Sequence, residues 1–444
     1  PGFCFEGGLP TIPEFFRDKH VLITGGTGFM GKVLIEKLVR SCGSVARIYL
    51  LVRQKKDKNA ADRIKELTEQ PVFERVLREQ PGAFERIVVP VNGDVTQEKL
   101  GLSAEDEDLL IRNVSIIFHV AASVRFDDPI PDAVRMNTRG TREVINLAKK
   151  MPNLKALLHV STTYCNCMRM EVEEKVYPMQ VDWREAIDVA EKVDRATLNI
   201  LSEKYLGKPS IVISTLKEPI PGWIDNFNGP TGLLVGVGKG VIRTTMADKS
   251  AVPDYMPVDV SVKAMIVAAW LTGEKGILPV YNSSSRYLSI STRELNDMGM
   301  EALMKYPFPK VLWYPSCVTT KNHTCFYVNH ILQHLVPALL LDNLLKLTNR
   351  QPLLVKLYRR YYLAMMALCY FTTKSWTFYN NKFLALCDEI HSTDREDFDF
   401  NFQNVAPKTF FENIIQGGYI YLLKNDLSLL PEARINIRRY KNIL

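Results

Sequence analysis

The segment that most constrains the fold is a short apolar strand that leads through closely spaced glycines into an amphipathic helix. Val21 to Thr24 precedes Gly25-Gly26-Thr27-Gly28-Phe29-Met30-Gly31, and apolar residues then recur at helical spacing as far as Ser41. Glycines at these intervals allow a tight turn, close approach of a pyrophosphate to backbone N–H groups, and close packing of the helix on the strand. The segment therefore predicts a dinucleotide site, with these cofactor-binding residues: Thr24, Gly25, Thr27, Gly28, Phe29, Met30 and Gly31.

Short apolar runs alternate with amphipathic segments through the first half of the chain. This alternation predicts an α/β fold of the Rossmann type, a doubly wound parallel sheet with helices on both faces. A helix is expected from Asp132 to Lys150, and the segment Lys217 to Gly240, rich in Pro, Gly and Asn, is expected to be a long loop over the site. The predicted strands are His20–Thr24, Arg47–Arg53, Ile87–Val91, Ile116–Ala122, Leu157–Thr162 and Ile211–Thr215.

The chain of 444 residues is long enough for two domains. From about Thr319 the pattern becomes helical and aromatic, so we expect a nucleotide-binding domain over 1–318 and a mostly helical domain over 319–444. Within the second domain, Phe326 to Leu347 and Tyr361 to Phe371 are the most apolar stretches. Polar residues interrupt the first, and the second is too short to cross a bilayer, so we expect buried or membrane-surface helices.

Residues at the ends of the predicted strands indicate which cofactor binds. Arg53 ends the second strand, where an NAD-binding protein usually has an acidic residue, and an arginine there suits the 2′-phosphate of NADP. Asp94 and Val95 follow the third strand, where an aspartate commonly meets adenine, although it could equally cap a helix. Ala121 and Ala122 end the fourth strand, where small side chains leave room for the cofactor.

Composition narrows the choice of partners. The net charge of +7 fits an anionic ligand, the face of an anionic membrane or an ordinary basic surface. The eight cysteines lack the paired spacing and neighbouring histidines of a zinc site, so no metal site is predicted and free thiols are expected. Pro1 to Pro10 does not have the pattern of a secretory signal. No nucleic-acid partner is expected.

Several longer motifs resemble the fatty acyl-CoA reductases, the alcohol-forming group of extended short-chain dehydrogenases. The resemblance begins with Val21 to Ile35 and covers nearly the whole chain. It implies an oxidoreductase with NADPH as cofactor, located at the peroxisome or endoplasmic reticulum, with peripheral membrane association. The other motifs that carry it are His119–Phe126, Asn137–Thr141, Val160–Asn166, Lys217–Trp223, Gly229–Gly232, Pro257–Asp259, Tyr370–Trp376 and Asp397–Phe400.

The reaction that the resemblance implies is two hydride transfers from NADPH, which reduce a long-chain fatty acyl-CoA through an aldehyde to a primary alcohol. Such chemistry needs a proton donor, which this group supplies with a tyrosine and a lysine four residues later, aided by a Ser or Thr at the end of the fifth strand. Thr162 matches that Ser or Thr and is expected to be catalytic, with a purely structural bond to backbone as the alternative. Pro209 and Ser210 match the family's cofactor-binding positions in the following strand.

The tyrosine and lysine have no matching helix. Leu206-Gly207-Lys208 runs directly into Pro209-Ser-Ile-Val212, where the resembling proteins have the helix that carries both residues. Tyr306 and Lys310 have the right interval, but Pro307 and Pro309 forbid a helix between them. Tyr205 lies only three residues before Lys208, with Pro209 next, so this pair is not expected to replace the missing one.

Three functions stay open on the sequence. The first is a fatty acyl-CoA reductase by descent whose present form lacks its acid and is expected to be inactive. The second is a non-catalytic protein that binds NADP and lipid. The third is another extended dehydrogenase such as a sugar-nucleotide epimerase, which the aromatic, helical last third and the Lys217–Trp223 loop disfavour.

Overall fold

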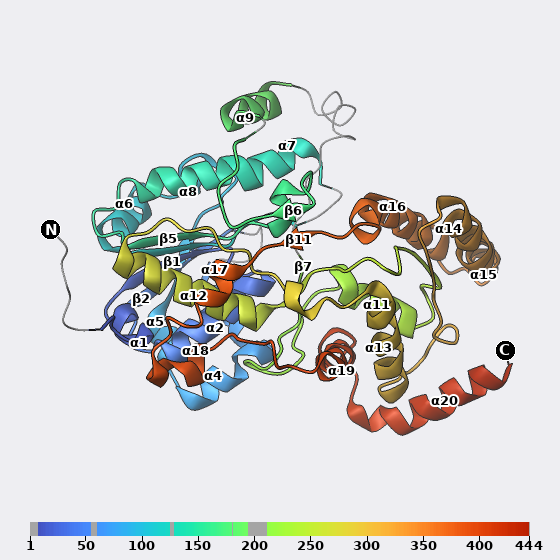
Figure 1. Ribbon diagram of the computed structural model, residues 1–444. Helices are drawn as coiled ribbons and strands as arrows, with labels where there is room; N and C mark the ends of the chain where they lie inside the picture. The colour runs from blue at the N-terminus through green and yellow to red at the C-terminus, as the bar shows by residue number, and fades with distance from the viewer. Residues whose placement is uncertain (1–7, 55–59, 125–127, 180, 194–210, 444) are drawn as a thin grey trace.

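A five-stranded parallel sheet lies at the centre of the nucleotide-binding part of the molecule (Figure 1). The structure is a computed structural model that describes residues 8–54, 60–124, 128–179, 181–193 and 211–443. The strand order is β3-β2-β1-β4-β5. The second and third strands therefore lie on one side of β1 and the next two on its other side, so the order of the strands reverses between β1 and β4. The strands are β1 His20–Thr24, β2 Arg47–Val52, β3 Val88–Asn92, β4 Ile116–His119 and β5 Ala156–His159.

Alternate residues of the sheet face two separate apolar cores, as expected for strands whose side chains alternate between faces. Val21, Ile48 and Ile116 face a large core that contains the helices α2 (Phe29–Ser41) and α12 (Val258–Lys275). Leu22 and Ile117 face a smaller core on the other side, which α6 (Ala104–Asn113) and α8 (Gly140–Ala148) cover. Figure 1 shows α6 and α8 above the sheet and α2 and α12 below it. The doubly wound architecture predicted from the sequence is confirmed.

The remaining elements surround this sheet. The helix predicted from Asp132 is present as α7 and α8, joined by a wide turn of helix, η3. Further helices of the first three hundred residues are α1 Ile12–Phe16, α3 Ala60–Thr68, α4 Glu74–Glu79, α5 Ala83–Ile87, α7 Ile130–Ala133, α9 Trp183–Lys192, α11 Gly229–Gly238 and α13 Thr292–Lys305. Short or widened turns of helix are η1 Pro71–Phe73, η2 Glu98–Gly101, η3 Val134–Arg139, η4 Thr163–Asn166 and η5 Arg286–Leu288.

The last 120 residues are mainly helical, as the sequence predicts. Their helices are α14 His323–His330, α15 Val336–Leu347, α16 Leu354–Thr372, α17 Asn381–Ala385, α18 Arg395–Phe398, α19 Pro407–Gly417 and α20 Leu430–Ile443. Shorter turns are η6 Ile331–Leu335, η7 Ser392–Asp394, η8 Gly418–Leu422 and η9 Leu427–Leu429. Small parallel strand pairs attach this part to the rest: β11 Thr377–Phe378 with β6 Glu171–Val172, and β10 Val318–Thr320 with β8 Thr244–Met246.

The sixth predicted strand does not join the main sheet within the described residues. Ile211–Ile213 forms β7, which pairs in parallel with β9 (Tyr255–Pro257) in a separate two-stranded sheet. The prediction of one six-stranded sheet is therefore wrong. A short apolar run encodes a strand but not the identity of its neighbour, because backbone hydrogen bonds are the same for any partner.

The loop predicted from Lys217 to Gly240 ends earlier than expected, because α11 begins at Gly229. Pro230 occupies the first turn of this helix, where a missing N–H costs nothing. The glycines that suggested a loop instead allow close packing: a Cβ on Gly238 would lie 2.5 Å from side-chain atoms of Leu303 and Phe308. The remaining loop, Leu216 to Asn228, lies against the cofactor-binding helix as described below.

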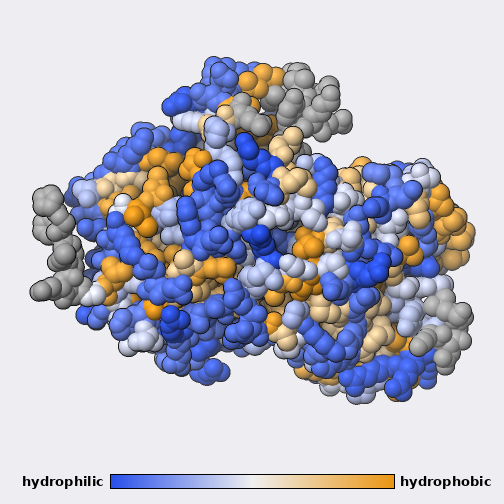
Figure 2. Space-filling view, in the orientation of Figure 1, coloured by the Kyte–Doolittle hydropathy of each residue, from blue (hydrophilic) through white to orange (hydrophobic). Residues whose placement is uncertain are grey.

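The first apolar stretch of the C-terminal part is more exposed than a core helix. His323–Leu347 forms a 25-residue helical run, apolar and long enough to cross a membrane by length and composition, and only 22% of its most apolar window is buried. Its buried residues are Phe326 and Ala338 together with the polar His330, His334 and Asp342. Figure 2 shows hydrophobic atoms at the edge of the molecule where Figure 1 places α14 and α15. Three of the polar residues that interrupt this stretch thus face the protein, and the expectation of a buried or membrane-surface helix stays a prediction.

Candidate cofactor site

The turn between β1 and α2 brings three backbones close together. Gly25 has a φ of +76°, and a Cβ there would lie 2.7 Å from the Ala121 backbone nitrogen at the end of β4. A Cβ on Gly31 would lie 2.7 Å from the Cα of Gly26 and closer still to the Gly25 carbonyl oxygen. Gly28 is the N-cap of α2 and its N–H donates to the Gly25 carbonyl oxygen at 2.9 Å. The turn therefore has the shape that lets a pyrophosphate reach the helix N-terminus.

Thr24 is fully buried and links β1 to β4 through His119. The Ala121 N–H donates to Thr24 Oγ1 at 3.3 Å, and Thr24 Oγ1 lies 2.7 Å from His119 Nδ1. The other ring nitrogen, Nε2, lies 3.0 Å from the hydroxyl of Thr141. Burial, with a smaller contribution from His159, lowers the pKa of His119 to about 4, so the ring is neutral at pH 7. Thr24 is thus a structural link beneath the turn.

Two arginines meet beside the glycine turn. Arg53 is exposed directly after β2, and its carbonyl oxygen accepts a hydrogen bond from Arg63 Nη1 at 2.7 Å. Arg63, on α3, also donates through Nη2 to the hydroxyl of Thr27 at 3.3 Å. Burial and the charge of Arg53 both lower the pKa of Arg63. The sequence predicted a role for Arg53 and none for Arg63, because Arg63 lies ten residues further along the chain.

Asp94 and Val95 shape the loop that follows β3. The backbone N–H and the hydroxyl of Thr96 both donate to Asp94 Oδ1, at 2.9 and 2.8 Å. Val95 is buried in the smaller core, beside Gly140 at the start of α8. Both residues therefore lie at the carboxyl edge of the sheet, the edge at which open α/β sheets bind ligands.

The segment after β4 is held by a side chain from the next helical run. The Ser123 N–H donates to Asn137 Oδ1 at 2.8 Å, and Asn137 Nδ2 donates back to the Ser123 carbonyl at 3.1 Å. Ala121 is half-buried and Ala122 is exposed just before this clamp, so both lie at the open edge of the sheet. Residues 125–127, which include the last two residues of the His119–Phe126 motif, lie outside the described residues.

Thr162 lies just beyond β5 and caps η4. Its Oγ1 accepts a hydrogen bond from the Tyr164 N–H at 3.1 Å. Tyr164 itself is buried against Phe371, Trp376 and Phe378, and burial raises its pKa. Thr162 thus follows the fifth strand by three residues and makes at least one bond to backbone, and its catalytic role stays a prediction.

The loop from Leu216 to Asn228 crosses the first turns of α2. The ring of Trp223 stacks on Phe29 with centroids 5.4 Å apart, and Asp225 pairs with Lys32 at 2.7 Å. Met30 packs against the large core between these contacts. The Lys217–Trp223 motif therefore holds the cofactor-binding helix, a function that its composition alone did not indicate.

The backbone of that loop is fixed by one buried carboxylate. The N–H groups of Leu216, Lys217 and Glu218 donate to Asp259 at 2.7, 2.8 and 3.0 Å. Asp259 is the last residue of the Pro257–Asp259 motif and lies at the N-terminus of α12, so two motifs that are 40 residues apart form one unit.

Several predicted site residues lie outside the described residues. These are Pro209 and Ser210 of the cofactor site, and the pair Tyr205 and Lys208 that was rejected as a proton donor. Tyr306 and Lys310 are described, and Tyr306 ends α13 before a non-helical segment, as expected from Pro307.

Two family models, both described as "Male sterility protein", match this chain. One is a nucleotide-binding model that matches residues 23–207 and 202–265, in two pieces. The other matches residues 333–425. The two pieces of the first match overlap at residues 202–207, directly before the point where the sequence predicts that the tyrosine- and lysine-bearing helix is missing.

Solved structures share the fold along nearly the whole chain. A reductase domain of a nonribosomal peptide synthetase from Mycobacterium tuberculosis aligns with a TM-score of 0.60, at 17% identity over 94% of each chain. The terminal reductase domain from the myxalamid biosynthetic pathway aligns with a TM-score of 0.56, at 19% identity over 93% of each chain.

Curated relatives cover almost all of the sequence. Fatty acyl-CoA reductase 1 of Xenopus laevis is 36% identical over 466 residues, which include 98% of this chain and 90% of that protein. Fatty acyl-CoA reductase 1 of Homo sapiens is 36% identical and fatty acyl-CoA reductase 2 of Mus musculus 35% identical, with the same coverage. The alignment of 466 residues is longer than the chain of 444, so the relatives carry residues that have no counterpart here. With this identity along its length and a nucleotide-binding turn of the expected geometry, the chain belongs to the fatty acyl-CoA reductase family.

Proposed function

We propose that this protein is built to reduce a long-chain fatty acyl-CoA to a primary alcohol with NADPH. The observation that carries this function is the match along nearly the whole chain to reductases of that name, together with a nucleotide-binding turn that has the required close approaches. The family match shows a nicotinamide cofactor, and bound NADPH would supply the hydride in both steps. The residues that hold it are proposed to be the predicted set from Thr24 to Ser210.

The preference for NADPH over NADH rests on the two arginines. Arg53 and Arg63 bring two positive charges to the end of β2, beside Thr27 of the glycine turn. A 2′-phosphate carries the negative charge that two guanidinium groups can bind by charge-assisted hydrogen bonds. Asp94 and Val95 are proposed to lie beside the adenine, and Ala121 and Ala122 beside the cofactor at the centre of the sheet edge.

Proton donation is the step for which this chain lacks a group at the family position. Thr162 is proposed to hold the carbonyl oxygen of the substrate at the end of β5. The division of the family match into two pieces at residues 202–207 favours a second candidate function, a protein that binds NADPH and lipid without turnover. The two functions differ only in whether a proton reaches the substrate oxygen.

One experiment separates the two candidates. NADPH oxidation is measured with palmitoyl-CoA for the chain as given and for a variant with a family-like Tyr-x-x-x-Lys helix inserted between Lys208 and Pro209. Binding of NADPH to both, with oxidation only in the variant, supports the non-catalytic form. Oxidation by the chain as given supports the reductase with another proton donor. Failure of both to bind NADPH would refute both functions.

Membrane association is proposed to use the helical hairpin α14 to α16. Leu332, Leu340, Leu347 and Leu363 are 62%, 64%, 82% and 66% exposed. Exposed cations lie on the same hairpin: Lys346, Arg350, Lys356, Arg359 and Arg360. Leucines flanked by cations fit the interface of an anionic bilayer.

The hairpin is held together by one buried carboxylate, so it presents its leucines as a fixed surface. Asp342 of α15 accepts hydrogen bonds from the N–H groups of Leu353, Leu354 and Val355 at the start of α16, at 3.1, 3.0 and 2.9 Å. Flotation with phosphatidylserine-containing vesicles should be lost on the double substitution Leu340→Glu and Leu344→Glu. The matched change Leu109→Glu, on α6, should leave flotation unchanged. Equal flotation of the parent protein and both variants would exclude the hairpin as the membrane-binding surface. The compartment, peroxisome or endoplasmic reticulum, and the division into domains after residue 318 stay predictions.

A further inference from the structure

Two sequence motifs that lie far apart in the chain meet in one aromatic cluster beside Thr162. Tyr164 belongs to the Val160–Asn166 motif, and its ring lies against three aromatic rings in or just beyond the Tyr370–Trp376 motif. These are Phe371, Trp376 and Phe378, with ring centroids 5.5, 5.2 and 4.8 Å from that of Tyr164. All three rings meet the Tyr164 ring at angles between 74° and 76°, the T-shaped arrangement that aromatic pairs favour. The C-terminal part of the chain therefore encloses the ring that follows Thr162 in the same turn.

The same C-terminal segment also holds the far end of this turn. The Cys167 carbonyl oxygen accepts hydrogen bonds from Trp376 Nε1 at 3.0 Å and from the Tyr370 hydroxyl at 3.3 Å. Directly beyond it, β11 pairs with β6, and the Thr377 N–H donates to the Met170 carbonyl oxygen at 2.8 Å. The turn is thus fixed from the C-terminal part both at its middle and at its end.

The hydroxyl of Thr162 is tied to the backbone of this turn. Its Oγ1 accepts a hydrogen bond from the Tyr164 N–H at 3.1 Å, and the Thr162 carbonyl oxygen accepts one from the Cys165 N–H at 3.2 Å. The Tyr164 carbonyl oxygen in turn accepts from the Cys167 N–H at 3.0 Å. Since hydrogen bonds are directional, the Tyr164 N–H sets the rotation of the Thr162 side chain. A shift of the Tyr164 ring or of the Cys167 carbonyl therefore moves the Thr162 hydroxyl.

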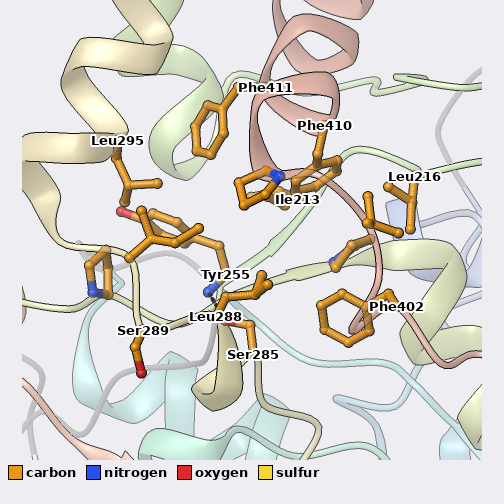
Figure 3. A pocket seen from close by; sticks show the side chains of 15 residues that line it. Ile213, Leu216, Tyr255, Ser285, Leu288, Ser289, Leu295, Phe402, Phe410 and Phe411 are labelled. Atoms are coloured by element: carbon orange, nitrogen blue, oxygen red, sulfur yellow. Dashed lines mark hydrogen bonds between the residues drawn. The ribbon is translucent and has the colours of Figure 1, made fainter.

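A second place where the C-terminal part meets the rest of the chain is the pocket in Figure 3, between β7, β9 and α19. Its cavity of about 40 Å³ has room for water but not for a fatty acyl chain. The residues that hold the Thr162 turn are not among the described side chains that line it. The aromatic cluster around Tyr164, and not this pocket, is therefore the contact that reaches the candidate catalytic residue.

We propose that Tyr164 and Trp376 are positioning residues for the reaction, which together hold the Thr162 hydroxyl where it binds the carbonyl oxygen of the substrate. They act through Thr162 and not on the substrate itself. The inference gives the second matched family region, residues 333–425, a part in the chemistry of the first. It rests on the proposed function in one respect, the role of Thr162 toward a carbonyl oxygen.

The test is a double-mutant cycle on the binding of octanal, a soluble aldehyde, measured by calorimetry on the full chain with saturating NADP⁺, which has no hydride to transfer. Thr162→Val should weaken octanal binding by about three- to tenfold, the loss of one hydrogen bond, and Thr162→Ser should retain it. Trp376→Phe keeps an aromatic ring without the N–H and should weaken binding by a similar factor. In the double variant the two losses should not add, because Trp376 acts only through the Thr162 hydroxyl.

Two further variants keep the test independent of folding defects. Tyr370→Phe removes the other hydrogen bond to the Cys167 carbonyl and should show the same lack of additivity with Thr162→Val. The matched control is Trp313→Phe, which makes the same substitution at a ring that is 39% exposed and lies against Arg243, so octanal affinity should stay within about twofold.

Hydrogen exchange of the turn is the readout that does not depend on the reaction. Trp376→Phe should speed exchange of the Tyr164, Cys165 and Cys167 amides by about tenfold and leave β1 and α2 unchanged. Unchanged exchange of the turn, or additive losses in the octanal cycle, would overturn the inference. Faster exchange in Trp376→Phe, together with no octanal binding by the parent or equal binding by Thr162→Val, would show that the turn is held as inferred and would count against the proposed role of Thr162 in a reductase.

Discussion

Lys37 Nζ of α2 lies 2.8 Å from Glu218 Oε2 of the loop that crosses that helix, and the Lys37 side chain is only 2% exposed. Glu218 also pairs with Arg40 at 2.9 Å and with Lys263 of α12 at 3.3 Å. Asp397, from the C-terminal part, reaches Lys37 at 3.2 Å. One carboxylate thus joins the cofactor-binding helix, the loop from Leu216 to Asn228 and α12, so the position of the cofactor turn depends on this cluster.

Glu218→Gln should destabilise the protein by about 3 kcal/mol at pH 7, because it leaves buried cations without their counter-charge. Burial alone would raise the pKa of Glu218, but Lys37, Lys263 and Arg40 outweigh it and lower the pKa to about 2. A carboxylate whose pKa is lowered by folding stabilises the folded state at pH values above 4.5, the ordinary pKa of a glutamate. That stability is lost as the pH falls toward 2. The difference between the two proteins in urea unfolding should therefore shrink below pH 4.5.

The control for this prediction is Glu301→Gln, which removes an exposed pair with Lys408. Exposed pairs contribute about 0–1 kcal/mol, so the midpoint of unfolding should hardly move. Equal effects of the two substitutions would show that the Glu218 cluster does not stabilise the fold.

Gly31→Ala should abolish NADPH binding and lower the unfolding temperature. The added Cβ would meet the backbone of Gly25 and Gly26, and backbone cannot move aside without opening the turn. Gly43→Ala is the matched control, since its nearest contact at 3.0 Å is the flexible end of the Gln80 side chain. A thermal scan and a fluorescence titration with NADPH measure both effects. NADPH binding by Gly31→Ala at the original affinity would argue against this turn as the pyrophosphate site.

Arg63→Ala should weaken NADPH binding by about ten- to a hundredfold and leave NADH binding almost unchanged. The expected loss corresponds to about 1.5–3 kcal/mol for hydrogen bonds to a charged group. Arg47→Ala, at the opposite end of β2, removes an equal charge far from the strand end and should affect neither cofactor. An equal loss for NADPH and NADH would instead mean that Arg63 supports the turn through Thr27 and does not bind the 2′-phosphate.

The sequence predicted the features whose signal is local. The strand, glycine turn and helix from Val21 to Ser41 could be located because spacing and residue type are both specified within twenty residues. The strand-end residues Arg53, Asp94 and Ala121 could be placed at one sheet edge because carboxyl ends of parallel strands meet there. The corresponding site roles still await the measurements above.

Relationships between distant segments could not be predicted. The pairing of β7 with β9 and the position of Arg63 beside Arg53 depend on how loops fold back, which no local pattern encodes. The same holds for Asp259, whose carboxylate fixes a loop forty residues earlier. His119 was visible within a quoted motif, but its role in joining Thr24 to Thr141 requires three segments to be placed in space.

Asp254→Asn should stabilise the protein at pH 8, and the gain should disappear as pH falls. Asp254 is buried; its Oδ1 accepts two hydrogen bonds from Ser285 at 2.7 Å, and its Oδ2 has no hydrogen-bond partner among the described residues. Burial raises the pKa of Asp254 above the ordinary value of 3.8. A carboxyl group whose pKa is raised by folding favours the folded state when it is protonated. Its contribution to stability is therefore complete only below pH 3.8, the ordinary pKa, and it is lost as the pH rises. Asparagine keeps the Oδ1 acceptor and does not ionise, so the expected gain at pH 8 is about 1–2 kcal/mol.

The control substitution, Asp248→Asn, is expected to change stability in the opposite direction. Hydrogen bonds from Ser250 and Lys321 lower the pKa of Asp248 to about 2, so Asp248→Asn should lower stability at pH 8, with the loss vanishing between pH 4 and pH 2. The midpoint of urea unfolding is measured from pH 4 to pH 8 for Asp254→Asn and from pH 2 to pH 8 for Asp248→Asn. A lower midpoint for Asp254→Asn than for the parent at pH 8 would mean that the folded protein holds the Asp254 carboxylate ionised.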